Sequence, residues 1–134
     1  MSDKPAQDWS VDDSHADKNR FKKYGKSHAR EVASCFANLA TVVGLLKAGA
    51  ALGSFRLNFF RRESGDIWRI GQTKVPSARE TRLYILVLVF PKAIHVLTIG
   101  DKDTQQADLA KCKQIESTVN NEIRETNERK QQNS

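Results

Sequence analysis

Apolar residues recur along this chain with two different periods, and the change of period separates helical from extended segments. Between residues 30 and 47, large apolar residues follow one another at steps of three and four: Val32, Phe36, Leu39, Val43 and Leu46. This spacing places them on one side of an α-helix. An amphipathic helix is therefore predicted here, and it should end near Lys47, where glycines and small residues follow.

Two shorter elements are expected before this helix. Residues 8–13 predict a brief edge strand, with Trp9 and Val11 on the same side of an extended segment. The segment that follows is strongly basic. We expect it to form a short helix that has Ser14 as its N-cap and Gly25 as its stop.

The middle of the chain alternates large apolar with polar residues, which is typical of β-strands. The stretch 63–66, Glu-Ser-Gly-Asp, has the composition of a hairpin turn and divides this alternation into two strands. One face of the first strand would carry Phe55, Leu57 and Phe59. The second strand would hold Ile67 and Arg69 on one face, and Trp68 and Ile70 on the other.

The rest of the chain predicts two further strands and a helix. After a polar loop that contains Pro76, residues 82–90 are apolar on both faces, as in a central strand covered from both sides. The last strand is predicted at 93–100. From about residue 107 to 125, one helical stripe consists of Cys112, Ile115, Val119 and Ile123.

Together these elements predict the α+β class, with a short N-terminal strand, two helices, an antiparallel sheet of about four strands and a C-terminal helix. The chain of 134 residues has the length of one domain, residues 1–134, with its core at about 9–125. Residues 1–7 and 126–134 have little to bury, so we expect them to be flexible.

Charge narrows the choice of partners. The formal net charge of +6 and the pI near 9.5 favour nucleic acid or an acidic protein. Cys35 and Cys112 lie far apart in apolar helical patterns, so we expect neither a metal site nor a disulfide, and no cofactor. No run approaches the roughly 18 apolar residues of a membrane span, and the N-terminus lacks an apolar leader. A cytoplasmic protein without membrane contact is expected.

Several stretches, in this order, carry a family resemblance: Trp9-x-Val11, the basic helix, LLKAG, FFRRESGDIWRI, ETRLYILV and IHVLTIGDKDTQQADL. In this order the chain resembles the RelE/ParE superfamily of toxins from type II toxin–antitoxin systems, from about Trp9 to Val119. The most specific pieces are Thr81-Arg82-Leu83-Tyr84 and the stretch 98–102, Thr-Ile-Gly-Asp-Lys.

The resemblance implies a small sheet with two N-terminal helices and one of two activities. RelE-like members cleave mRNA, usually on the ribosome, whereas ParE-like members inhibit DNA gyrase. Cleavage by attack of a ribose 2′-hydroxyl adds negative charge to the scissile phosphate, and fixed cations stabilise that charge without a metal. The resemblance places Arg69, Arg82 and Lys102 where the family keeps basic residues.

Other residues are candidates for RNA contact or for proton transfer. Phosphate-binding candidates are Lys74 in the loop, Arg62 on the hairpin, and Lys22, Lys23 and Lys26 on the basic helix. Arg61 and Arg62 are adjacent on a strand, so only one of them can join a given site. RelE-like nucleases commonly present a tyrosine or histidine near the last strand as acid or base, and here the candidates are His95, Asp103 and Gln106.

Each of these candidates also has a structural interpretation. Asp103 can N-cap the last helix, with Gln106 completing a capping pair. This pairing leaves Lys102 unexplained, because a helix N-terminus repels a cation unless an anion binds there. For the basic helix, a solvated face is an interpretation of equal weight to a nucleic-acid surface, since most charge runs are solvated.

A toxin of this kind implies an acidic antitoxin as partner, laid over the basic surface and assembled with the toxin into a heterotetramer, with mRNA and the ribosome as targets. Two alternatives stay open: a ParE-like inhibitor that binds gyrase, and a non-catalytic RNA-binding module.

Overall fold

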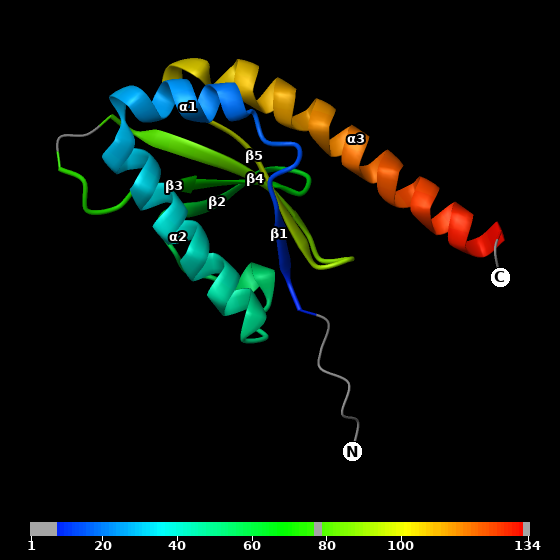
Figure 1. The fold of residues 1–134 in the computed structure, drawn as a ribbon. Helices are drawn as coiled ribbons and strands as arrows, with labels where there is room; N and C mark the ends of the chain where they lie inside the picture. Colours follow the sequence, from blue (N-terminus) through cyan, green and yellow to red (C-terminus); the bar gives the residue numbers. More distant parts are fainter. Residues whose placement is uncertain (1–7, 77–78, 133–134) are drawn as a thin grey trace.

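One twisted sheet lies between two layers of helix in the computed structural model, which describes residues 8–76 and 79–132 (Figure 1). The elements are β1 (Ser10–Asp12), α1 (Lys18–Ser27), α2 (Ala29–Lys47), the 3₁₀ turn η1 (Leu52–Ser54), β2 (Phe60–Ser64), β3 (Ile67–Gly71), β4 (Thr81–Leu88), β5 (Ala93–Asp101), the 3₁₀ turn η2 (Lys102–Thr104) and α3 (Gln105–Gln132). Residues 1–7, 133 and 134, which were expected to be flexible, lie outside the described residues, as do positions 77 and 78 of the predicted loop.

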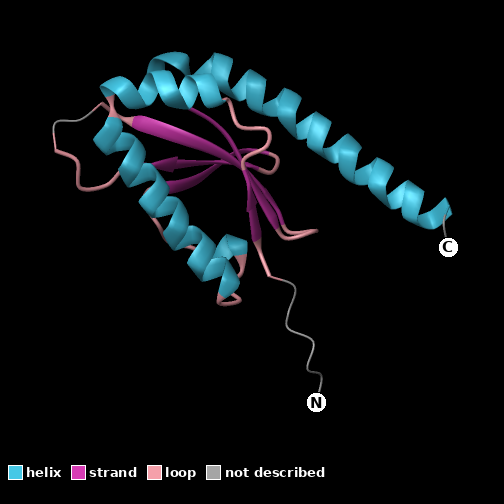
Figure 2. Cartoon of the chain, in the orientation of Figure 1, coloured by secondary structure: helices cyan, strands magenta, loops and turns pink. Residues whose placement is uncertain are grey.

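The sheet has the order β1-β5-β4-β3-β2, and its four later strands are antiparallel neighbours (Figure 2). The short β1 lies parallel to β5, with Val11 opposite Ile94, so the whole sheet is mixed. The predicted α+β class and order of elements are confirmed, and the arrangement is consistent with RelE-like topology.

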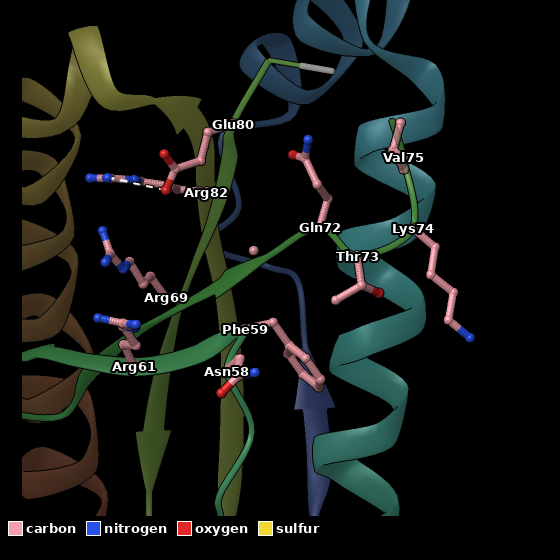
Figure 3. Close-up of a pocket in the computed structure, with 11 residues that line it drawn as sticks. Asn58, Phe59, Arg61, Arg69, Gln72, Thr73, Lys74, Val75, Glu80 and Arg82 are labelled. Carbon is pink, nitrogen blue, oxygen red and sulfur yellow. Dashed lines mark hydrogen bonds and ion pairs between the residues drawn. The ribbon is translucent and has the colours of Figure 1, made fainter. Parts of the chain in front are cut away.

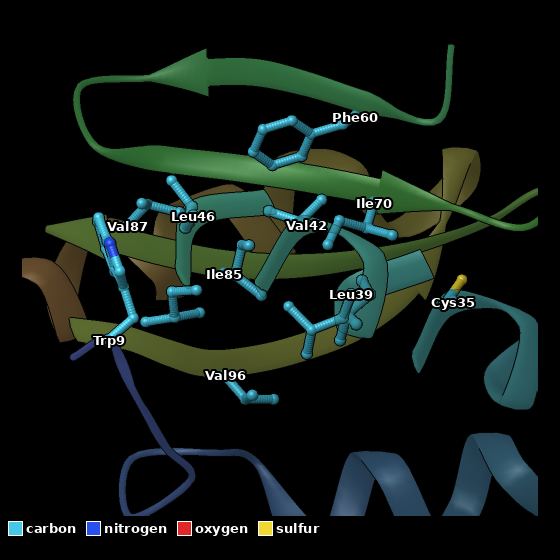
Figure 4. Close-up of a cluster of buried hydrophobic side chains, with 12 residues drawn as sticks. Trp9, Cys35, Leu39, Val42, Leu46, Phe60, Ile70, Ile85, Val87 and Val96 are labelled. Atoms are coloured by element: carbon cyan, nitrogen blue, oxygen red, sulfur yellow. The ribbon is translucent and has the colours of Figure 1, made fainter. Parts of the chain in front are cut away.

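The central strand β4 supplies apolar side chains to both layers, as its sequence predicts, and all eight of its residues are buried. Leu83, Ile85 and Val87 face α2 and form one core with Leu39, Val42 and Leu46 (Figure 4). The alternate residues Tyr84, Leu86 and Leu88 face α3 and form a second core with Cys112 and Val119. Each buried aliphatic side chain of this kind contributes about 1.5–3 kcal/mol.

The N-terminal segment differs from its prediction. Trp9 is buried, but Val11 is 50% exposed, because only Trp9 reaches the α2 core. Helix α1 begins at Lys18 with Asp17 as N-cap, while Ser14 is bound to Asp12 in the preceding turn. Gly25 lies inside α1 rather than ending it.

Helix α2 ends at Lys47 as predicted, but its buried stripe is rotated from the predicted one. Phe36 is 37% exposed, whereas Glu31 and Asn38 are buried. Both polar side chains have partners there, since Asn38 Nδ2 donates to the Gly71 carbonyl and Glu31 contacts His28 Nδ1. The helix is long and apolar enough to cross a membrane by length and mean hydropathy, and here its apolar stripe packs on the sheet.

Two predicted boundaries also move. The first hairpin strand begins only at Phe60, so Phe55 and Leu57 pack on the core from an irregular segment around η1. At the other end, α3 continues to Gln132, beyond the predicted end near residue 125, so residues 126–132 are helical. Glu, Arg, Lys and Gln dominate this last part, and all four are good helix formers without needing burial.

Candidate functional site

Three arginines from three adjacent strands meet at the face of the sheet that α3 covers. Arg61 on β2 lies directly opposite Arg69 on β3, and Arg82 on β4 lies opposite Gly71, two residues further along β3. Side chains alternate along a strand, so all three arginines share one face. They line an open cavity of about 520 Å³ together with Asn58, Phe59, Gln72, Thr73, Lys74, Val75, Glu80 and the backbone of Gly71 (Figure 3).

The pair Arg61–Arg69 is an unfavourable arrangement for the sheet by itself. Like charges directly opposite each other on neighbouring strands are destabilising. Glu63 offsets one of them, because its Oε1 lies 3.0 Å from Arg69 Nε in a largely buried ion pair. Arg61 stays exposed and has no acidic partner among the described residues. The cavity therefore keeps a net positive field that an anion would relieve.

Arg82 is the most buried cation of the three, with 8% of its surface exposed. Its Nη1 donates to Gln105 Oε1 at 2.5 Å, and its Nη2 lies 3.4 Å from Glu80 Oε1. Its Nε is buried without a hydrogen-bond partner among the described residues. A buried donor without a partner costs about 1–3 kcal/mol, so the protein holds Arg82 here at the expense of stability.

Gly71 opens the floor of this cavity between Arg69 and Arg82. A Cβ at this position would meet its nearest atoms, the carbonyl oxygens of Thr81 and Phe59, only at 3.8 and 3.9 Å. The strand would therefore accept a larger side chain, and glycine is not required by its backbone. Its effect is to leave free space in the lining of the cavity beside Arg82.

The structure brings together some of the predicted basic residues and separates others. Arg69, Arg82 and Lys74 line the same cavity, although the Lys74 side chain is directed away from the arginines (Figure 3). Arg62 faces the other way, and its Nε donates to the Gly65 carbonyl at 2.6 Å across the hairpin turn. Lys102 is exposed at the start of η2 and is not among the described residues that line the cavity.

The basic helix α1 presents a separate surface. Lys22 and Lys23 are exposed along it. Lys26 lines a second hollow of about 450 Å³ at the corner between α1 and α2, together with Arg30 and Arg79. Of the three lysines on α1 that were predicted to contact phosphate, Lys26 thus has other cations beside it.

The predicted acid–base candidates lie away from this cavity. His95 contacts the β1 side of the sheet, 4.0 Å from Asp12 Oδ1, and burial lowers its pKa. Asp103 accepts a hydrogen bond from Arg79 Nη2 at 2.5 Å. Gln106 is exposed in the first turn of α3. None of the three is among the described residues that line the cavity.

The cap of the C-terminal helical segment is Asp101 rather than Asp103. Asp101 accepts from the backbone of Asp103 and Thr104, and the Thr104 hydroxyl accepts from the Asp101 N–H, which completes a capping box. The intervening turn η2 shifts the cap two residues toward the N-terminus, so the predicted pairing of Asp103 with Gln106 is wrong. Burial raises the pKa of the nearby Asp108 carboxyl, which accepts the Thr104 hydroxyl at 2.6 Å.

Sequence patterns did not assign three residues of this region to the site, and one of them is itself an arginine of the cluster. Arg61 was recognised only as one of two alternatives, and Gln105 and Glu80 were not assigned to the site. Tyr84 is the tyrosine nearest to the cluster, on the same face of β4 as Arg82, but it is fully buried and burial raises its pKa to about 12. It is closed to a substrate in this conformation.

Comparison with protein families, with curated proteins and with solved structures finds no match to this chain.

Proposed function

We propose that this protein is a RelE-like toxin that cleaves mRNA, with the ribosome as the place of cleavage. The observation that carries the proposal is the convergence of Arg61, Arg69 and Arg82 on one open cavity, where two of them oppose each other at a cost to the sheet. Such a cluster binds a phosphodiester and stabilises the extra negative charge that develops on phosphorus during attack.

The reaction that fits this chemistry is attack of a ribose 2′-oxygen on the adjacent phosphorus. The cluster supplies fixed cations, and the reaction class needs no metal to stabilise the phosphorane charge. Arg82 lines the cavity, and its buried Nε has no hydrogen-bond partner among the described residues, so its guanidinium would gain a hydrogen bond by turning toward a phosphate oxygen. Lys26 and Arg30 would follow the RNA backbone beyond the cavity.

An acidic antitoxin is the partner that this function implies, in a heterotetramer and in the cytoplasm. A hollow of about 440 Å³ between α2 and β1 supports a protein partner, because Val11, Phe36 and Val43 line it together with Lys47. Apolar side chains beside a lysine fit an acidic amphipathic segment.

The test is induction of the protein in growing bacteria, with methionine and thymidine incorporation followed in parallel and RNA 5′ ends mapped. Early loss of methionine incorporation with new 5′ ends inside mRNAs is the expected result, and Arg82→Ala should abolish both. An early loss of thymidine incorporation alone would instead identify a gyrase inhibitor. Unchanged incorporation of both, with the protein accumulating in soluble form, would refute the toxin function.

A further inference from the structure

The cationic cavity contains one acidic side chain among the described residues that line it, and this is Glu80. A carboxylate inside a phosphate-binding cavity repels the ligand, so it weakens binding of the ground state. Its presence there needs a reason other than affinity, and the reaction supplies one. Attack by a 2′-hydroxyl requires a group that accepts the hydroxyl proton.

The position of Glu80 suits contact with a substrate. It stands immediately before the first residue of β4, two residues from Arg82 and on the same side of the strand. Its side chain is 65% exposed, and Arg82 Nη2 at 3.4 Å is its one charged partner among the described residues. Figure 3 shows its carboxylate directed toward Arg82, above the guanidinium groups of Arg69 and Arg61.

The other acidic side chains around the site are already engaged. Glu63 is held by Arg69 in a largely buried pair, and Asp101 and Asp103 are both bound to Arg79. Asp108 is buried beneath Gly100 and bound to Thr104. Glu80 is therefore the least constrained of these carboxylates, since its one charged contact among the described residues is the 3.4 Å pair with Arg82 at the edge of the cavity.

We propose that Glu80 is the general base of the cleavage reaction, an assignment that rests on the proposed nuclease function. The Glu80 carboxylate takes the proton of the 2′-hydroxyl while the 2′-oxygen forms a bond to phosphorus. The bond from phosphorus to the 5′-oxygen breaks, and this oxygen takes a proton from water. The hydroxide left behind takes the proton from Glu80, which restores the carboxylate and the water molecule. The products are a 2′,3′-cyclic phosphate and a 5′-hydroxyl, with no change of oxidation state and no co-reactant.

The experiment compares wild type, Glu80→Gln and the control Glu125→Gln, which removes the same charge from the exposed later part of α3. Single-turnover cleavage of a short RNA is measured from acidic to basic pH, on programmed ribosomes and free. Affinity is measured separately with the same RNA carrying a 2′-deoxyribose at the cleavage position, which binds but cannot react. Circular dichroism confirms that each variant is folded.

The expected result is a loss of cleavage rate of about 10²–10⁴-fold in Glu80→Gln, the usual contribution of a positioned base. The acidic limb of the wild-type pH–rate profile should disappear in this variant. Its affinity for the deoxy-substituted RNA should be equal to or higher than that of wild type, because a repulsive charge is gone. Glu125→Gln should follow wild type in every measurement.

Two results would overturn the assignment while leaving the nuclease function intact. One is a Glu80→Gln protein that cleaves within about threefold of wild type at every pH, since a lost base costs far more. The other is an equal fall of affinity and rate with an unchanged pH profile, which would mean that Glu80 only positions Arg82. Wild-type protein that cleaves the RNA neither on ribosomes nor free in solution would instead refute the proposed function itself.

Discussion

Replacing Arg82 by methionine should abolish activity without weakening the fold. The side chain is buried on the face of β4 that α3 covers, and methionine has a similar length without the charge. If Arg82 is retained for its action on phosphate, the free energy of unfolding of Arg82→Met should equal or exceed that of wild type. A residue kept for structure would behave in the opposite way.

The contacts of Arg82 give the size of the effect. Its hydrogen bond to Gln105 is worth about 1.5–3 kcal/mol, and its pair with the exposed Glu80 adds at most about 1 kcal/mol. Against these stand the unsatisfied Nε, at about 1–3 kcal/mol, and the desolvation of a buried guanidinium, which costs several kcal/mol. Replacement of buried ionic groups by apolar ones of similar volume is often neutral or stabilising by about 1–4 kcal/mol.

Urea unfolding at neutral pH, followed by circular dichroism, measures this difference directly. Leu83→Ala, on the same strand but in the α2 core, is the matched control and should lose about 2–5 kcal/mol. A loss of about 3 kcal/mol or more in Arg82→Met would refute the reasoning, because it would show that the guanidinium is a net stabiliser of the fold.

Three further predictions concern neighbouring positions. Arg61→Ala should weaken binding of the deoxy-substituted RNA about tenfold while Arg62→Ala leaves it unchanged, because only Arg61 lines the cavity; equal effects in a filter-binding titration would contradict this. Gly71→Leu should fill the cavity and abolish cleavage with no loss of thermal stability. Melting temperature and RNA-end mapping check this, and a variant that is destabilised or still cleaves RNA would contradict the prediction. Burial raises the pKa of Asp108, so the folded state favours its protonated form, and the stability that this form contributes is lost as pH rises from the usual carboxyl range through the raised pKa. Asp108→Asn should therefore raise the melting temperature more at pH 7 than at pH 4. An equal effect at both pH values would refute this.

The sequence predicted where the helices and strands lie better than which of their side chains are buried. Period and turn composition were enough to find both hairpin strands, the buried β4 and the end of α2, since these signals are local. Which of Arg61 and Arg62 enters the site depends on the register of β2 against β3. The amino-acid sequence shows that the two side chains point to opposite faces of the strand, but it does not show the register. The stripe of α2 was misplaced because the partners of Glu31 and Asn38 are polar groups that hydrophobic periodicity does not detect.

The site itself was predictable only in part. Arg69 and Arg82 were identified through the resemblance, and the structure brings them together. The contact of Arg82 with Gln105 joins the start of β4 to the start of α3, and the arrangement of Glu80 depends on the loop before β4; both are tertiary facts. Asp101 was missed as a cap because the 3₁₀ turn η2 precedes the α-helix and shifts the cap by two residues.

Because Arg61 and Arg69 oppose each other, binding of an anionic ligand should raise the melting temperature of the protein. A fold that holds Arg61 against Arg69 without a bound anion carries a repulsion that any fitting polyanion removes, so binding and folding are thermodynamically linked. A ligand present at about 100 times its dissociation constant adds about 2.7 kcal/mol to the free energy of unfolding. Melting curves recorded against a set of short RNAs can therefore rank substrates by sequence before any cleavage assay exists.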